Sequence, residues 1–125
     1  MKYLILFLLP LISGISISDE KDWNDCIEKY DSKWGEQCTG CNVYKDSFKV
    51  FLKNTCNEAV DVQVAMQNTN KKWQVYYKGN LNQGDTLSAW ACKGSGKWLY
   101  WTRKAGDTEI EFYNEYQINS IYKDY

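Results

Sequence analysis

The feature that most constrains the fold of this chain is an alternation of apolar and polar side chains with a period of two. It begins near residue 47 and recurs in short segments that clusters of Asn, Gly, Asp and Ser separate. Such alternation is typical of strands that bury one face, and short turns between them are typical of antiparallel sheets. The predicted strands are residues 48–53, 60–67, 73–78, 87–92, 97–103 and 108–113. Residues 114–122 are interpreted as either a last strand or a frayed tail.

The N-terminal part of the chain shows a different spacing. Apolar residues recur at intervals of four, three and four, which predicts a short helix over residues 22–34. These apolar residues are Trp23, Ile27, Tyr30 and Trp34. We therefore expect a mainly β fold, an antiparallel β-sandwich or barrel of six to seven strands, with a short N-terminal helix and disulfide staples.

The first residues have the pattern of an export signal. Lys2 precedes an apolar run over residues 4–12, and the small residues Ser16 and Ser18 fit a cleavage site before Asp19. The apolar run is shorter than the roughly 20 residues that a membrane-spanning helix needs.

These features predict the domain organisation. We expect a signal peptide over residues 1–18 and a single β-domain over residues 19–125, in which residues 19–42 form a helical, cysteine-containing extension. The expected location is secreted or periplasmic, with no membrane span.

Composition excludes several classes of chemistry. The chain has no histidine, so it contains no Ser-His-Asp triad, no Cys-His pair and no His-ligated metal site. The 15 Lys and Arg nearly balance the 16 Asp and Glu, which gives no strong signal for nucleic acid. Glu109 and Glu111 look like one solvated strand face. We therefore predict no catalytic residue, no metal site, no cofactor and no enzyme activity.

Five cysteines follow the predicted cleavage site: Cys26, Cys38, Cys41, Cys56 and Cys92. In an oxidising compartment they are expected to pair, and their odd number leaves one thiol free or available to a second chain. Cys56 and Cys92 each stand at a predicted strand end, so we expect a bridge between them. Cys26 would then pair with either Cys38 or Cys41.

Cys38 and Cys41 form a CxxC motif with three interpretations. A redox pair with a lowered thiol pKa needs a strand before the motif and a helix after it, and here the predicted order is reversed. A zinc site would need acidic residues as its further ligands. Structural bridging is the interpretation that we favour.

Aromatic residues are abundant, with six Trp, ten Tyr and four Phe. Tyr76 and Trp90 are predicted to lie opposite the buried face of their strands, and residues 97–103 carry tryptophans on both faces. Exposed aromatic rings beside polar side chains suit stacking on sugars or bases. The alternative is that the N-terminal helix covers this face. The candidate binding residues are Tyr76, Trp90, Trp101 and Arg103.

Residues 48–56, the valine-rich residues 62–65, Trp73 and the Gly84-Asp85 turn resemble small secreted bacterial proteins of uncharacterised function. These proteins share a strand ending in Asn and Cys, a valine-rich second strand, a Trp-containing third strand and a Gly-acid turn. The resemblance covers about residues 47–91 and implies an exported β-domain. Thaumatin-like proteins begin with a similar strand, but they are longer and much richer in cysteine.

The sequence thus predicts an exported, noncatalytic binding or envelope-associated module. Its expected contact surface is an aromatic and polar sheet face, and its partner would be a glycan or a protein. Two alternatives remain open: a thiol-redox protein using Cys38 and Cys41, and a secreted toxin or inhibitor. No Asn-x-Ser/Thr sequence occurs, which favours a bacterial source.

Overall fold

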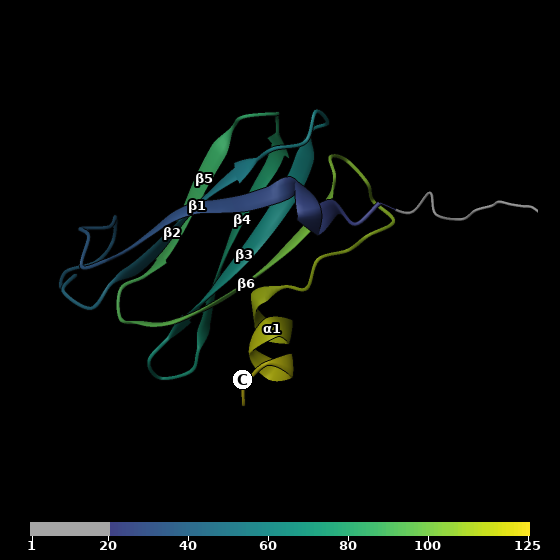
Figure 1. Ribbon diagram of the computed structural model, residues 1–125. Helices are drawn as coiled ribbons and strands as arrows, with labels where there is room; N and C mark the ends of the chain where they lie inside the picture. The colour runs from purple at the N-terminus through teal and green to yellow at the C-terminus, as the bar shows by residue number, and fades with distance from the viewer. Residues whose placement is uncertain (1–20) are drawn as a thin grey trace, which may run out of the picture.

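The computed structural model describes residues 21–125, and the predicted signal peptide over residues 1–18 lies outside them (Figure 1). Within residues 21–125, a 3-10 helix, six strands and an α-helix follow one another along the chain. They are η3 (Trp23–Cys26), β1 (Ile27–Trp34), β2 (Phe48–Asn54), β3 (Val60–Asn68), β4 (Trp73–Leu81), β5 (Thr86–Ala91), β6 (Gly94–Lys104) and α1 (Glu115–Ile121).

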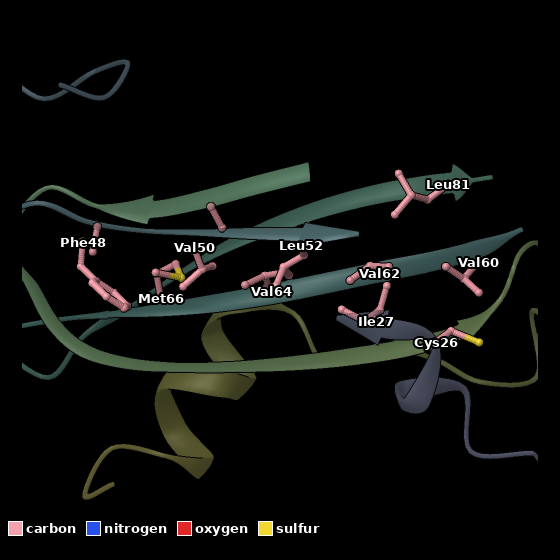
Figure 2. Close-up of a cluster of buried hydrophobic side chains, with 12 residues drawn as sticks. Cys26, Ile27, Phe48, Val50, Leu52, Val60, Val62, Val64, Met66 and Leu81 are labelled. Atoms are coloured by element: carbon pink, nitrogen blue, oxygen red, sulfur yellow. The ribbon is translucent and has the colours of Figure 1, made fainter. Parts of the chain in front are cut away.

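The six strands form two antiparallel sheets of three strands each. One sheet has the order β1–β2–β5 and the other has the order β4–β3–β6. Apolar side chains from both sheets meet in one buried core between them (Figure 2). The predicted mainly β, disulfide-stapled fold is therefore confirmed, with six strands in two sheets that do not close into one.

The two central strands show the predicted alternation to different extents. On β2, the buried Val50 and Leu52 alternate with half-buried Lys49, Phe51 and Lys53, as the period of two predicts. On β3, side chains on both faces are buried, so the expected half-buried strand is wrong there. The reason is that β3 is the middle strand of a sheet whose outward face is also covered.

The predicted helix over residues 22–34 is wrong beyond its first turn. Only η3 is helical, and β1 then pairs with β2. A β-bulge between Lys29 and Asp31 inserts an extra residue, so the buried Ile27 and the largely exposed Trp34 lie on the same side of β1 although they are seven positions apart. The bulge thus breaks the period of two and produces a spacing that imitates a helix.

The predicted strand over residues 108–113 is irregular chain, and the next segment is the helix α1. A capping box begins this helix: Asn114 Oδ1 accepts from the backbone N–H of Gln117 (2.8 Å), and Gln117 Oε1 accepts from that of Asn114 (2.9 Å). Ile118 and Tyr122, four residues apart, then lie on the buried side. Neither a strand nor a frayed tail describes residues 114–122.

Disulfides join Cys26 to Cys56 and Cys41 to Cys92, and Cys38 is a buried free thiol. The expected Cys56–Cys92 bridge is therefore wrong, and so is the expected pairing of Cys26 with Cys38 or Cys41. Two bridges with one thiol left over match the predicted count.

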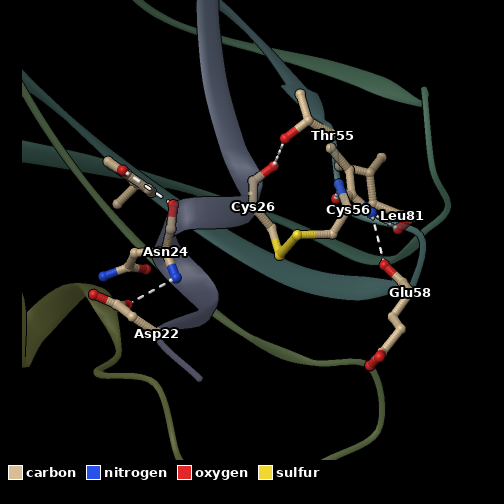
Figure 3. Close-up of a disulfide and its surroundings, with 9 residues drawn as sticks. Asp22, Asn24, Cys26, Thr55, Cys56, Glu58 and Leu81 are labelled. Carbon is tan, nitrogen blue, oxygen red and sulfur yellow. Dashed lines mark hydrogen bonds between the residues drawn. A yellow bond between two sulfur atoms is a disulfide. The ribbon is translucent and has the colours of Figure 1, made fainter. Parts of the chain in front are cut away.

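The register of the β1–β2–β5 sheet decides this pairing. Ile27 pairs with Asn54, which brings Cys26 and Cys56 together with their Cα atoms 5.1 Å apart (Figure 3). Thr55 strengthens the same junction, because its backbone N–H and its hydroxyl both donate to the carbonyl of Cys26. Strand neighbours, rather than strand ends as such, therefore determine which cysteines meet.

Candidate functional site

Each sheet has one face in the shared core and one face turned outward, and the two outward faces differ. The outward face of β4–β3–β6 is covered at one end by α1, whose Ile118 is fully buried against Ala65 and Trp73 (Figure 1), and further along by the segment before α1, where Tyr113 packs on Trp101. We call this surface the covered face. It comprises Ala65, Trp73, Val75, Leu99 and Trp101.

Helix α1 is also bound to the edge of β4 by hydrogen bonds. Asn119 Oδ1 accepts from the backbone N–H of Trp73 (2.7 Å), and Asn119 Nδ2 donates to the carbonyl of the same residue (3.1 Å). Glu115 Oε1 accepts from the backbone N–H of Val75 (3.1 Å). These side chains replace a missing strand neighbour, so α1 protects the sheet edge as well as the covered face.

The outward face of β1–β2–β5 has no such cover in the described chain. There, η3 packs on β6 and the start of β1, while α1 packs on β4. We call this second surface the open face. It comprises Tyr30, Lys33, Lys49, Phe51, Lys53 and Trp90.

Strand register gathers these residues from three strands. On β2, Lys49, Phe51 and Lys53 share the outward side because the intervening residues point into the core. Lys33 of β1 and Trp90 of β5 both pair with Lys49, one from each side. Tyr30, the extra residue at the bulge of β1, adds a third aromatic ring to the same surface, next to the ring of Phe51.

Lysines and rings alternate across the open face and contact one another. The ammonium-to-centroid distances are 5.0 Å for Lys49 and Phe51, 5.7 Å for Lys33 and Phe51, 5.7 Å for Lys49 and Trp90, and 5.7 Å for Lys53 and Tyr30. All four lie within the range of cation–π attraction. The surface is therefore a connected layer of aromatic rings with cations resting on them.

Within residues 21–125, the lysines of the open face form no ion pair. Among residues 21–125, the one ion pair joins Arg103 to Asp61 on the other sheet. Glu28 and Asp31 lie on the open side of β1, and a carboxylate oxygen of Asp31 accepts from the backbone N–H of Ser32 (2.8 Å). In the part of the chain that the structure describes, the open face thus carries three lysines that form no ion pair. The two nearby carboxylates of β1 keep the net charge of this surface low.

Tyr76 and Trp90, both predicted as binding residues, do meet, with ring centroids 5.0 Å apart. Tyr76, however, packs against the core between the sheets instead of an outer face. Burial raises the pKa of its hydroxyl to about 12, and this hydroxyl donates to the carbonyl of Trp90 (2.7 Å). Trp90 Nε1 in turn donates to the carbonyl of Thr39 (3.0 Å), which fixes its ring at the border of the open face.

Trp101 and Arg103, the other two predicted residues, lie on β6 of the opposite sheet. Trp101 belongs to the covered face and packs against Tyr113 and Tyr122, with centroids 6.4 and 6.1 Å away. Arg103 Nε donates to Asp61 Oδ2 (2.9 Å). The four predicted residues therefore form two separate groups.

Asp61 is held as a carboxylate by several donors. Burial alone would raise its pKa, but hydrogen bonds from the backbone N–H groups of Asn80 and Gly106 and the guanidinium of Arg103 lower the pKa below its usual value of 3.8. Through these hydrogen bonds, Asp61 on β3 is joined to β4, to β6 and to the turn after β6, so its role is structural.

The CxxC motif is divided between two roles. Cys41 is bonded to Cys92, whereas Cys38 Sγ donates to the carbonyl of Glu36 (3.2 Å). The two cysteines therefore do not form a bridge with each other. Within the described residues, no group of three or more His, Cys, Asp or Glu side chains is placed to hold a metal ion.

Two concavities lie beside the covering segments. A groove of about 1170 Å³ runs between α1 and the β3–β4 hairpin, with Gln74, Tyr116 and Lys123 among its lining residues. A smaller pocket of about 350 Å³ lies beside Trp101, and Asn24 on η3 contributes to its wall. The groove is also lined by three lysines and two aromatic residues, Lys71, Lys72, Lys123, Trp73 and Tyr116, but within residues 21–125 no cation–π contact joins them as on the open face.

Sequence reasoning identified Trp90 on the open face and missed the remaining residues. The signal for β2 was present, because Lys49, Phe51 and Lys53 alternate with buried apolar residues. The contribution of β1 was hidden, because residues 22–34 had the spacing of a helix.

Comparison of the chain with protein-family models, with curated proteins and with solved structures finds no match. Among the described residues, no helix has the length and apolar character needed to cross a membrane.

Proposed function

We propose that this protein is an exported, noncatalytic binding module whose contact surface is the open face. The observation that carries the proposal is the contrast between the outward faces. The covered face is closed by α1, whereas the open face keeps three rings and three lysines on the surface of a supported sheet. Aromatic side chains on a rigid sheet form a preorganised recognition surface, because they lose little side-chain freedom on binding.

The compartment and architecture belong to the same proposal. Two disulfides in a small domain support an oxidising location, secreted or periplasmic, and the N-terminal pattern of the sequence supports export. Two facing sheets around one core support a β-sandwich. The absence of histidine from the sequence supports a role without acid–base or nucleophilic catalysis of the common kinds.

Co-sedimentation tests the binding function. Residues 19–125 are mixed with insoluble cellulose, chitin, peptidoglycan and cross-linked polygalacturonate, and the protein in each pellet is quantified. We expect retention on at least one of these materials, reduced about tenfold in affinity by Phe51→Ala, since removal of a contact ring typically costs 1–3 kcal/mol, here taken as about 1.4.

The matched control is Tyr116→Ala, which removes an aromatic side chain that is 82% exposed on α1. This variant should sediment like the parent protein. Retention on none of the materials, or equal losses in the two variants, contradicts the open face as the contact surface.

A further inference from the structure

We propose that the ligand of the open face is a polysaccharide whose sugar units carry carboxylates, an inference that rests on the proposed binding function. The central observation is an uncompensated pair of like charges. Lys33 and Lys49 occupy directly opposed positions on β1 and β2, and the ammonium groups of both lie over the ring of Phe51, the next outward residue of β2. Like charges opposite one another in a sheet are unfavourable, and no carboxylate among residues 21–125 forms an ion pair with them.

An anion placed above Phe51 would remove this repulsion. Both ammonium groups lie within 6 Å of the ring centroid, so one carboxylate near the ring comes within reach of both flexible side chains. Further along the face, Lys53 lies over the ring of Tyr30, and here the residue directly opposite the lysine on β1 is the acidic Glu28. The ring centroids of Tyr30 and Phe51 are 6.1 Å apart, which gives two neighbouring ring-plus-cation positions.

The rings select a sugar from among the possible anions. A pyranose presents one face of C–H bonds, which packs on the electron-rich face of an aromatic ring. In the free protein, the ammonium groups rest on these ring faces. When they turn toward a carboxylate, the faces become available, so one acidic sugar uses both the charge and the ring.

The low net charge of the open face argues against polyanions such as nucleic acids, whose binding needs many clustered cations. Glu28 and Asp31 share the outward side of β1 with the lysines, and the whole chain has a formal net charge of −1. Nucleic acid binding depends on neutralising many phosphates with clustered Lys and Arg. A polymer with one carboxylate on each sugar ring matches the open face better.

Polygalacturonate and its fully methyl-esterified form provide the test, because they share a backbone and differ in charge. Binding of residues 19–125 to each soluble polymer is measured by calorimetry, with poly-L-glutamate as an anion that lacks sugar rings. We expect polygalacturonate to bind at least about tenfold more tightly than either of the others, and added salt to weaken it.

Two variants separate the roles of charge and ring. Lys49→Gln removes the cation that lies over both Phe51 and Trp90. Phe51→Leu removes the ring but keeps an apolar side chain. Each should weaken binding of polygalacturonate by about tenfold. Lys123→Gln is the matched control for Lys49→Gln, and Tyr116→Leu is the matched control for Phe51→Leu. Both controls change residues on or near α1 and should leave the affinity unchanged.

Four outcomes overturn this ligand class. Equal binding of the methyl ester would indicate a neutral glycan, and equal binding of poly-L-glutamate would indicate a response to charge alone. In either case, sensitivity to Phe51→Leu would leave the proposed binding function standing. Binding that survives both open-face substitutions places the ligand elsewhere and contradicts both proposals. Failure of all three polymers to bind removes the acidic polysaccharide, and the insoluble panel then decides the binding function separately.

Discussion

The two sheets of this protein are held in different ways. The β4–β3–β6 sheet is packed on both faces, by the shared core and by α1. The β1–β2–β5 sheet is packed on one face, and both disulfides lie at the ends of its strands or in their connections. Covalent links thus stabilise the sheet on whose outer face residues 21–125 place no second layer.

This difference explains how a small domain keeps one sheet face free. The covered face is apolar and needs a layer over it, whereas the open face alternates lysines with rings that remain compatible with water. Disulfides reduce the entropy of the unfolded chain without occupying surface. The open face therefore gains support that does not obstruct contact with a ligand.

The largest expected effect comes from removing a disulfide of the open sheet. The double substitution Cys41→Ser and Cys92→Ser opens a link across a sequence separation of 51 residues. The chain-entropy relation predicts a loss of about 4 kcal/mol in the free energy of unfolding, measured by urea titration. Hydrogen exchange should show the greatest loss of protection in β5 and in the connection from β1 to β2.

Cys38→Ser is the matched control, because it replaces a buried thiol without breaking a bridge. It should cost less than about 1.5 kcal/mol. If the control and the double variant lose equal stability, the bridge is not what stabilises the open sheet.

The next effect tests the cover on the other sheet. Ile118 is fully buried under α1, so Ile118→Ala should lower the free energy of unfolding by about 2–5 kcal/mol. Ile121 is 54% exposed on the same helix, and Ile121→Ala should change stability by less than about 0.5 kcal/mol. Similar effects of the two substitutions in urea titrations would contradict α1 as the layer that closes the covered face.

A smaller effect should depend on pH. Asp61→Asn keeps the side-chain size but weakens the hydrogen bonds from three donors, so we expect a loss of about 1–3 kcal/mol at pH 7. The pKa of Asp61 is lower in the folded than in the unfolded protein. Its contribution is therefore fully present above the unfolded pKa, about 4, and is lost as pH falls through the folded pKa.

Urea titrations of the parent and the Asn variant between pH 7 and pH 2 provide the measurement. The stability difference between the two proteins should shrink as the carboxylate becomes protonated. A difference that stays constant down to the lowest pH contradicts the role of the charged form.

The smallest expected effect is on the open face itself. Lys33→Gln removes one of two opposed cations and should leave the free energy of unfolding unchanged or raise it by a few tenths of a kcal/mol. Lys123→Gln on the other side of the molecule is the control for removing a surface charge. If Lys33→Gln destabilises the protein by more than about 1 kcal/mol, Lys33 is part of the structural framework and the contrast between the faces fails.

The strands that sequence reasoning found have a local signal. On β2, buried and outward side chains alternate along seven residues without interruption, so the pattern alone predicts the structure. On β1, one bulged residue shifts the alternation and imitates helical spacing. The capping box at Asn114 and Gln117 was also a local signal for α1, and the interpretation of residues 114–122 overlooked it.

The candidate site could be predicted only in part. Trp90 was placed on an outward face, but Tyr76 lies against the shared core and Trp101 lies in the covered face under Tyr122. Their positions depend on which elements pack against each sheet. The residues of the open face come from three strands, and their proximity follows from strand register.

The sequence by itself determined the mainly β character, the absence of histidine chemistry and the expected number of disulfides, because local periodicity and composition express these properties. The tertiary structure decided the pairing of Cys26 with Cys56 and of Cys41 with Cys92, the position of α1, and which sheet face remains open. These properties depend on contacts between residues far apart in the chain. Only the folded arrangement of strands specifies such contacts, because many pairings satisfy the same local pattern.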